Sequence, residues 1–235
     1  MSALNILSGG AAQGLVASLA SKFKAKTGLD ITGEFGAVGA MAVKLRGGVP
    51  ADLLVLTAAV IADLAREKLV VGASITDIGL VETAIAVRSG DPLISVRDAA
   101  TLRAALLAAD AIFVPDITAS TAGIHVAKIL RQLGIADDVA ARLNIFSNGA
   151  TAMRHLAASD ATRPIGCTQS TEIISTSGVK LSGPLPTGCE LSTMYTAAVA
   201  SGAADPAHAR DLIELLSGAD QNEFRQSAGF ISGGK

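Results

Sequence analysis

Short hydrophobic runs alternate with longer amphipathic segments along the whole chain. The runs are three to seven residues long, and most of them end at small polar residues or glycine. Bounded apolar runs of this length are typical of buried strands. They predict strands at 4–7, 31–35, 52–56, 83–87, 112–114, 144–146, 165–168 and 194–200.

The segments between these runs have the spacing of helices. Leu15, Leu19 and Phe23 recur on one face of a helix predicted over 14–26. A second helix is predicted to end at Gln132, and a third lies near the C-terminus, where Ala209, Leu212, Ile213 and Leu216 are in phase. Alternating strands and helices predict an α/β fold with largely parallel sheets.

Two segments interrupt this alternation and indicate where the chain passes between lobes. Residues 72–82 and 182–193 are rich in Gly, Pro and small polar residues. If both are crossings, lobe one consists of 1–80 plus 194–235 and is discontinuous, and lobe two consists of 81–193.

Charge and hydropathy argue against two kinds of partner, nucleic acid and the membrane interior. The net charge is −2, and Lys and Arg do not cluster, which argues against nucleic acid. No run of 18 apolar residues occurs, so we expect no membrane insertion. The N-terminal MSALNILSGG lacks the basic and long apolar regions of a secretory signal. We therefore expect a cytoplasmic protein if the chain is full length, and a periplasmic one if a signal peptide was removed.

The sequence contains no motif that is typical of a cofactor or metal site. The histidines are scattered, so we expect no metal, and no phosphate-loop, serine-hydrolase or zincin motif occurs. We expect no cofactor. Cys167 and Cys189 are too few for a disulfide framework, and two free thiols or one disulfide both remain open.

Small polar residues and glycine follow almost every predicted strand, at the point where a helix begins. In α/β sheets, ligands bind outside the carboxyl ends of the strands. The first N–H groups of a helix have no partner within it, so converging helix starts form an anion site. Ordinary helix capping by the same residue types is the alternative. The six junctions are Ser8–Gln13, Gly36–Gly39, Thr57–Ala59, Asp116–Gly123, Ser147–Gly149 and Gln169–Thr171.

None of these junctions contains Lys or Arg, so a bound anion would be held by N–H and O–H dipoles. Tyr195, the only tyrosine, begins the last predicted strand and is expected at a hinge or at the wall of the site. The candidate ligand-binding residues are Ser8, Gly10, Ala11, Ala12, Gln13, Ala37, Val38, Thr57, Ala58, Ser120, Thr121, Ala122, Gly123, Gln169, Ser170 and Tyr195.

Three elements carry a resemblance to a known family. They are FKAKTG at 23–28, FGAVGAM at 35–41 and GVPADLL at 48–54. The chain resembles the periplasmic molybdate-binding proteins of ABC importers. The resemblance implies a two-lobe type II periplasmic binding protein fold with two crossover hinge strands. It also implies a small anionic ligand in the cleft between the lobes and, if the protein is exported, an ABC permease as partner.

The differences from that family bear on the ligand. Ala11 and Val38 stand where molybdate binders have serines, and Gln169 stands where they have a tyrosine. We therefore expect an organic polycarboxylate rather than molybdate or tungstate, which remain an alternative. The elements NGATAM at 148–153, TQSTEI at 168–173 and GPLP at 183–186 resemble a branch that includes aconitate isomerase.

That resemblance makes an allylic isomerase of a tricarboxylate a further alternative. Such an enzyme needs a positioned base and donors for the developing negative charge. His125 and Glu172 are weak candidates for the base, and the catalytic residues remain unknown. Asp116 is expected to cap the turn that follows its strand.

Overall fold

The computed structural model describes residues 3–231, which divide into two compact units. Within the described residues, unit 1 consists of 3–81 and 193–231, and unit 2 of 82–192. The expected lobes were 1–80 plus 194–235 and 81–193, so the observed bounds differ by one residue at each crossing. Two strands contain these crossings: β4, Thr76–Arg88, and β9, Ser192–Val199.

Unit 1 contains a mixed sheet in the order β2-β1-β3-β9. β2 and β3 are parallel to β1, whereas β9 is antiparallel to β3. The strands are β1 Ala3–Gly9, β2 Asp30–Gly36, β3 Leu53–Thr57 and β9. The helices are α1 Gln13–Thr27, α2 Val38–Arg46, α3 Ala58–Arg66, α9 Pro206–Ser217 and α10 Asn222–Ser227.

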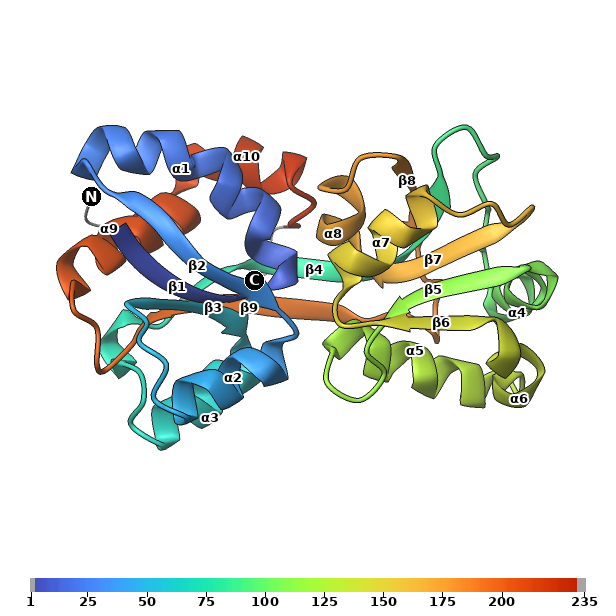
Figure 1. Ribbon diagram of the computed structural model, residues 1–235, viewed down its shortest axis with the longest axis horizontal. Helices are drawn as coiled ribbons and strands as arrows, with labels where there is room; N and C mark the ends of the chain where they lie inside the picture. The colour runs from blue at the N-terminus through green and yellow to red at the C-terminus, as the bar shows by residue number, and fades with distance from the viewer. Residues whose placement is uncertain (1–2, 232–235) are drawn as a thin grey trace. The chain divides into compact units, whose positions relative to one another are not determined.

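Helices cover both faces of this sheet. Figure 1 shows α1, α9 and α10 on one face and α2 and α3 on the other. The apolar stripe of α1 that the spacing predicted is buried, because Leu15, Leu19 and Phe23 are fully enclosed in the unit 1 core. Short 3₁₀ turns complete the unit at Gly10–Ala12, Gly72–Ser74 and Ala219–Gln221.

Unit 2 contains a second mixed sheet in the order β4-β7-β5-β6, with β8 also paired to β4. β5, β6 and β7 are mutually parallel, whereas β4 is antiparallel to both β7 and β8. The strands are β5 Ala111–Pro115, β6 Leu143–Phe146, β7 Pro164–Gln169 and β8 Val179–Pro184. The helices are α4 Ala99–Ala108, α5 Thr121–Gln132, α6 Ala136–Val139, α7 Gly149–Ala157 and α8 Ser170–Ile174, with a 3₁₀ turn at Ala140–Arg142.

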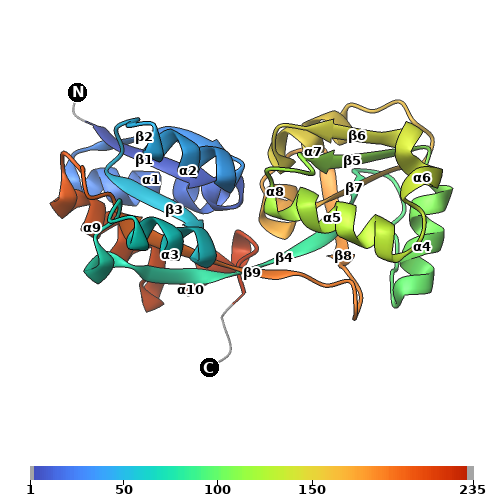
Figure 2. The same ribbon diagram turned by 90° about the horizontal axis from the view of Figure 1, so that it is seen from below.

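The alternation of side chains along β5 explains the two layers of unit 2. Ile112 and Val114 pack with α4, α5 and α6, and Phe113 packs with α7 on the opposite face. Figure 2 shows α4, α5 and α6 on one side of the strands, and Figure 1 shows α7 and α8 on the other.

Three expectations need correction. The sheets are mixed rather than largely parallel, because β4, β8 and β9 pair in antiparallel fashion. The segment 72–82 is mostly strand, since β4 begins at Thr76. β8 lies partly within the other expected crossing, 182–193, and no run predicted it. Its exposed Lys180 and Leu181 interrupt the apolar pattern.

Candidate functional site

In unit 1, three strand ends lie along one edge of the sheet. β1, β2 and β3 are parallel, and Gly9 is directly opposite Gly36 in the register. Thr57 at the end of β3 is opposite Tyr195 of the antiparallel strand β9. The helices that follow these strands therefore start at this edge, as predicted.

Gly9 brings β1, α2 and β9 into close contact. A Cβ at Gly9 would lie 2.9 Å from Tyr195 Cε1 and 2.9 Å from Val38 Cγ1. The backbone of Gly9 thus lies against the tyrosine ring and the first residue of α2. Gly9 lies within the predicted junction Ser8–Gln13 but was not among the candidate ligand-binding residues, although the pair of glycines after the first strand was a signal for it.

The unit 1 junctions offer backbone donors more than side-chain donors. Ser8 is buried, and its hydroxyl donates to the carbonyls of Gly9 at 3.0 Å and Val55 at 3.3 Å. We therefore leave the Ser8 side chain out of the proposed site. Ala11 and Ala12 are buried, and Gln13 is exposed.

In unit 2, the ends of β5, β6 and β7 also share one sheet edge, because these strands are parallel. α5 follows β5 after a turn that Asp116 organises. Its Oδ1 accepts hydrogen bonds from Thr118 N at 2.7 Å, Thr118 Oγ1 at 2.6 Å and Ala119 N at 3.0 Å. These bonds lower the pKa of Asp116, the hydroxyl of Thr118 contributing most. Asp116 caps this turn, as the sequence predicted.

Gly123 lets the start of α5 pack closely on the end of β5. A Cβ at this position would lie 2.1 Å from the carbonyl oxygen of Asp116 and 2.5 Å from that of Pro115. Both neighbours are backbone atoms, so they cannot rotate away. The glycine sets how closely Ser120, Thr121 and Ala122 lie to the strand end.

Side-chain caps are present at some helix starts and absent at others, and α6 and α10 also begin without one. α2, α3 and α5 begin after Ala37, Thr57 and Ser120, and none of these residues makes a side-chain capping hydrogen bond. Their first turns also carry no acidic residue. In contrast, Asp98 caps α4 in a capping box, and Asp205 caps α9. The capping alternative therefore does not account for α2, α3 or α5, whose first N–H groups lack a side-chain cap.

The junction before α7 differs from these three. Asn148 caps α7 by accepting a hydrogen bond from Thr151 N at 2.8 Å. The buried carboxyl of Glu172 also lies at this helix start, where Thr168 Oγ1 donates to it at 2.6 Å. Ordinary helix capping therefore accounts for the polar residues at the start of α7.

The two weak candidates for a catalytic base are both engaged within unit 2. His125 Nε2 lies 2.8 Å from the carbonyl oxygen of Cys189. Glu172 is 5% exposed, and burial raises its pKa, while hydrogen bonds from Thr168 and the backbone of Ala150, Gly149 and Gln169 oppose that shift. Neither geometry favours proton abstraction from a bound ligand.

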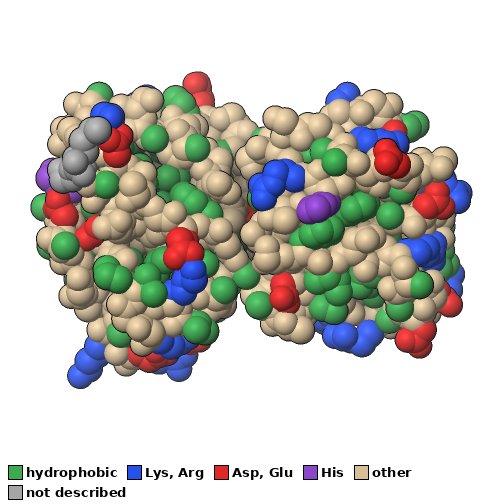
Figure 3. All heavy atoms as spheres, viewed as in Figure 1, with side chains coloured by type: hydrophobic (Ala, Val, Ile, Leu, Met, Phe, Trp, Pro, Cys, Tyr) green, Lys and Arg blue, Asp and Glu red, His purple; other side chains and the backbone are tan. Residues whose placement is uncertain are grey.

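Cations do not gather on the visible face of the molecule. Figure 3 shows Lys and Arg side chains dispersed over it. Among residues 3–231, no group of His, Cys, Asp and Glu forms a metal site, and no helix is long and apolar enough to cross a bilayer. Cys167 and Cys189 are buried free thiols.

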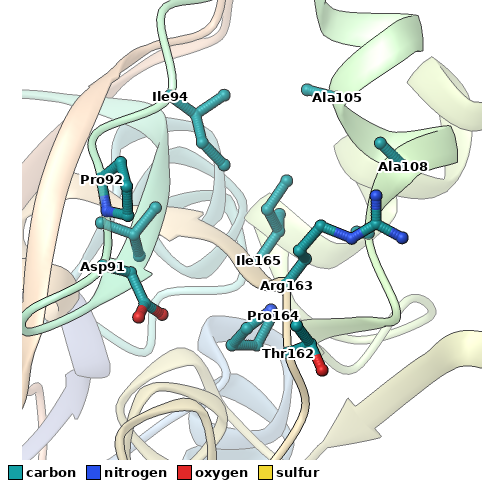
Figure 4. Close-up of a pocket in the computed structure, with 11 residues that line it drawn as sticks. Asp91, Pro92, Ile94, Ala105, Ala108, Thr162, Arg163, Pro164 and Ile165 are labelled. Atoms are coloured by element: carbon teal, nitrogen blue, oxygen red, sulfur yellow. The ribbon is translucent and has the colours of Figure 1, made fainter.

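Unit 2 also contains a cavity of about 300 Å³, at the opposite end of β7 from Gln169. Pro164 and Ile165, at the start of the strand, line it together with the end of α4 (Figure 4). Its charged lining residues have partners, since Arg163 pairs with Asp110 and Asp91 with Arg88. This mostly apolar cavity is separate from the helix starts.

Asp52, in the GVPADLL element, stabilises unit 1. Its Oδ2 accepts from Asn5 N at 2.9 Å, and its Oδ1 accepts from Ala204 N at 2.8 Å and Asp205 N at 3.0 Å. The carboxylate joins the starts of β1 and β3 to the segment before α9. A motif that suggested the family therefore maintains the fold.

Comparison with solved structures shows that the chain has the two-lobe α/β fold of periplasmic binding proteins, which confirms the predicted fold class. The periplasmic molybdate-binding protein of Azotobacter vinelandii has a TM-score of 0.83 and 16% identity, over 98% of this chain and all of that one. The sulfate-binding protein SubI of Mycobacterium tuberculosis has a TM-score of 0.75 and 17% identity, over 98% and 86%. Peb3 of Campylobacter jejuni, with L-phospholactate bound, has a TM-score of 0.69 and 16% identity, over 98% and 100%.

A match to a family model identifies the protein family. Residues 4–231 match the model of the bacterial extracellular solute-binding proteins, and the chain belongs to that family. The resemblance to periplasmic binding proteins is thereby confirmed. No curated protein sequence matches the chain. None of these comparisons supports an isomerase.

Proposed function

We propose that this solute-binding protein holds a small anion between its two lobes, using helix starts from both units, and delivers it to an ABC permease. The observation that carries the proposal is that three helix starts without side-chain caps, after Ala37, Thr57 and Ser120, follow the carboxyl ends of parallel strands. Each helix start presents N–H groups and the positive end of a helix dipole. Such groups bind an anion without any Lys or Arg.

The proposed contacts come from both units. In unit 1 they are the backbone of Gly9 to Ala12, the starts of α2 and α3 with the Thr57 hydroxyl, and the ring of Tyr195. In unit 2 they are the hydroxyls of Ser120 and Thr121, the backbone of Ala122, and the segment of Gln169 and Ser170. Ligand contacts from two lobes favour the closed state over the open one.

An organic polycarboxylate is the ligand class that we favour. Ala11 and Val38 are apolar and buried at the helix starts, so they supply no hydroxyl to an inorganic oxyanion. Gln169 occupies the position before α8 and offers an amide in place of a phenol. Fewer hydroxyl donors and more apolar surface suit a ligand with carbon between its anionic groups.

A thermal-shift panel tests ligand class directly. The panel contains molybdate, tungstate, sulfate, phosphate, citrate and the two aconitates, each against chloride at equal ionic strength. A ligand at a hundredfold excess over its Kd stabilises the folded state by about 2.7 kcal/mol. We expect a tricarboxylate to give the largest shift. A shift with molybdate or tungstate alone would reverse the preference for carboxylates, and no shift with any anion would contradict the proposal.

Paired variants test the role of the helix starts. Ser120→Ala removes a hydroxyl that caps nothing, so we expect a stability change of about 0.5 kcal/mol or less. Loss of the hydrogen bond from this hydroxyl to a charged ligand should raise the Kd by about tenfold or more. Asp98→Ala is the matched control, because it removes a true cap and should cost about 1 kcal/mol without changing affinity. Thr57→Ala should behave like Ser120→Ala if both units bind one ligand.

Proton exchange separates binding from isomerisation. Incubating cis- or trans-aconitate with the protein in deuterated water should leave its vinyl and methylene NMR signals unchanged. Enzyme-dependent exchange at these positions would instead support the isomerase alternative.

A further inference from the structure

Glu172 is a buried carboxyl that the proposed ligand contacts do not use. It lies on α8 but reaches the start of the neighbouring helix α7, and Figure 1 shows the two helices side by side. A Cβ at Gly149 would be 1.9 Å from Glu172 Oε2 and 2.1 Å from Thr168 Oγ1. The carboxyl therefore fills the space that this glycine leaves open.

Every group that reaches the Glu172 carboxyl donates a hydrogen bond. Thr168 Oγ1 donates at 2.6 Å, and the backbone N–H groups of Gly149, Ala150 and Gln169 donate as well. A carboxylate can accept all four. The three backbone N–H groups can only donate, so the NH₂ of an amide at this position has no acceptor among them. The bond to Gln169 N is the reciprocal half of a capping box, since Glu172 is the third residue of α8 and Gln169 precedes the helix.

These contacts give the start of α7 an internal anion. We propose that Glu172 is a positioning and specificity-determining residue, whose carboxylate permanently occupies the start of α7 and holds Gln169 and Ser170 in place for the ligand. This inference rests on the proposed anion-binding function. In unit 2 the ligand then contacts only the segments 120–123 and 169–170, and a further anionic group is excluded from α7.

Removing the carboxylate should leave a vacant site for a small anion. In Glu172→Ala, we expect the melting temperature to fall by about 5–10 °C, because several donors lose their acceptor. Sodium formate should restore at least about 3 °C of this loss, compared with sodium chloride at the same ionic strength. Wild type and Glu190→Ala, which removes an exposed glutamate of unit 2, should not respond to formate.

A neutral isostere keeps the inference testable if Glu172→Ala does not fold. Glu172→Gln should lose about 5 °C and gain nothing from formate, because the amide fills the space. Wild-type stability in Glu172→Gln would overturn the inference. So would equal formate responses in wild type and Glu172→Ala.

Ligand affinity tests the positioning role separately. For whichever panel anion stabilises the wild type, we expect Glu172→Gln to raise the Kd at least about tenfold, and Glu190→Ala to change it less than twofold. An unchanged Kd in Glu172→Gln would overturn the positioning role. If no panel anion binds the wild type, the proposed function fails, while the formate response of Glu172→Ala still decides whether α7 holds an internal anion.

Discussion

Replacing Gly123 by alanine should destabilise the protein, although the same change stabilises most helices. In an exposed helix interior, Gly→Ala contributes about 1 kcal/mol of stability. At this position the new Cβ would lie 2.1 Å from the carbonyl oxygen of Asp116, whereas Cβ atoms essentially never approach within 3.0 Å. The helix start must therefore move about 0.9 Å away from the end of β5 to reach that limit.

The loss of stability in Gly123→Ala depends on which atoms the new Cβ would contact. Overpacking typically costs about 1–3 kcal/mol, and more when the neighbour cannot move. Both close neighbours of Gly123 are backbone oxygens, so we expect a net loss of about 3 kcal/mol in the free energy of unfolding. For a protein of this size, that corresponds to a fall in Tm of about 6–12 °C.

Urea and thermal unfolding followed by circular dichroism measure this loss, and calorimetric titration with the panel anion measures affinity. We expect affinity to fall at least about tenfold, because Ser120 and Thr121 move with the helix start. Gly72→Ala is the control, since a Cβ there meets nothing within 4 Å and should change stability by about 0.5 kcal/mol. A Gly123→Ala variant as stable as wild type would refute the close packing of α5 on β5.

Three further predictions concern other groups. Asp52→Ala should lower the free energy of unfolding by about 3 kcal/mol, because it leaves three backbone donors of unit 1 without an acceptor, and urea unfolding would show this. The pKa of Asp116 is lowered in the folded state, so its contribution is present above the unfolded pKa and is lost as the pH falls through the folded one. The stability difference between wild type and Asp116→Ala should therefore vanish in acid, and a constant difference would contradict this assignment. Burial raises the pKa of Cys167 to about 12 and also raises that of Cys189, so neither thiol should react with a disulfide reagent before unfolding, as absorbance would show.

The family motifs and the fold carry different kinds of information. GVPADLL includes Asp52, which joins β1, β3 and the segment before α9. TQSTEI includes Glu172, which joins β7, α8 and α7. Both acidic residues maintain structure, Asp52 at the amino ends of β1 and β3 and Glu172 at the start of α7, so neither motif by itself identifies the ligand.

The alternation of apolar runs and helical stripes by itself determined the α/β class and the position of most elements, because side-chain periods of two and 3.6 are local properties of the chain. It also located the junctions where strands end and helices begin. β8 escaped this reasoning, since it lies outside the apolar pattern and is stabilised by pairing with β4.

Only the tertiary structure decided which helix starts have a side-chain cap and which do not. Ser120 and Asn148 are both typical capping residues, yet only Asn148 caps its helix. The hydroxyl of Ser8 donates to a neighbouring strand, and Glu172 reaches the start of a different helix. Hydrogen-bond partners such as these come from distant parts of the chain and depend on how strands and helices pack, so local sequence could not specify them.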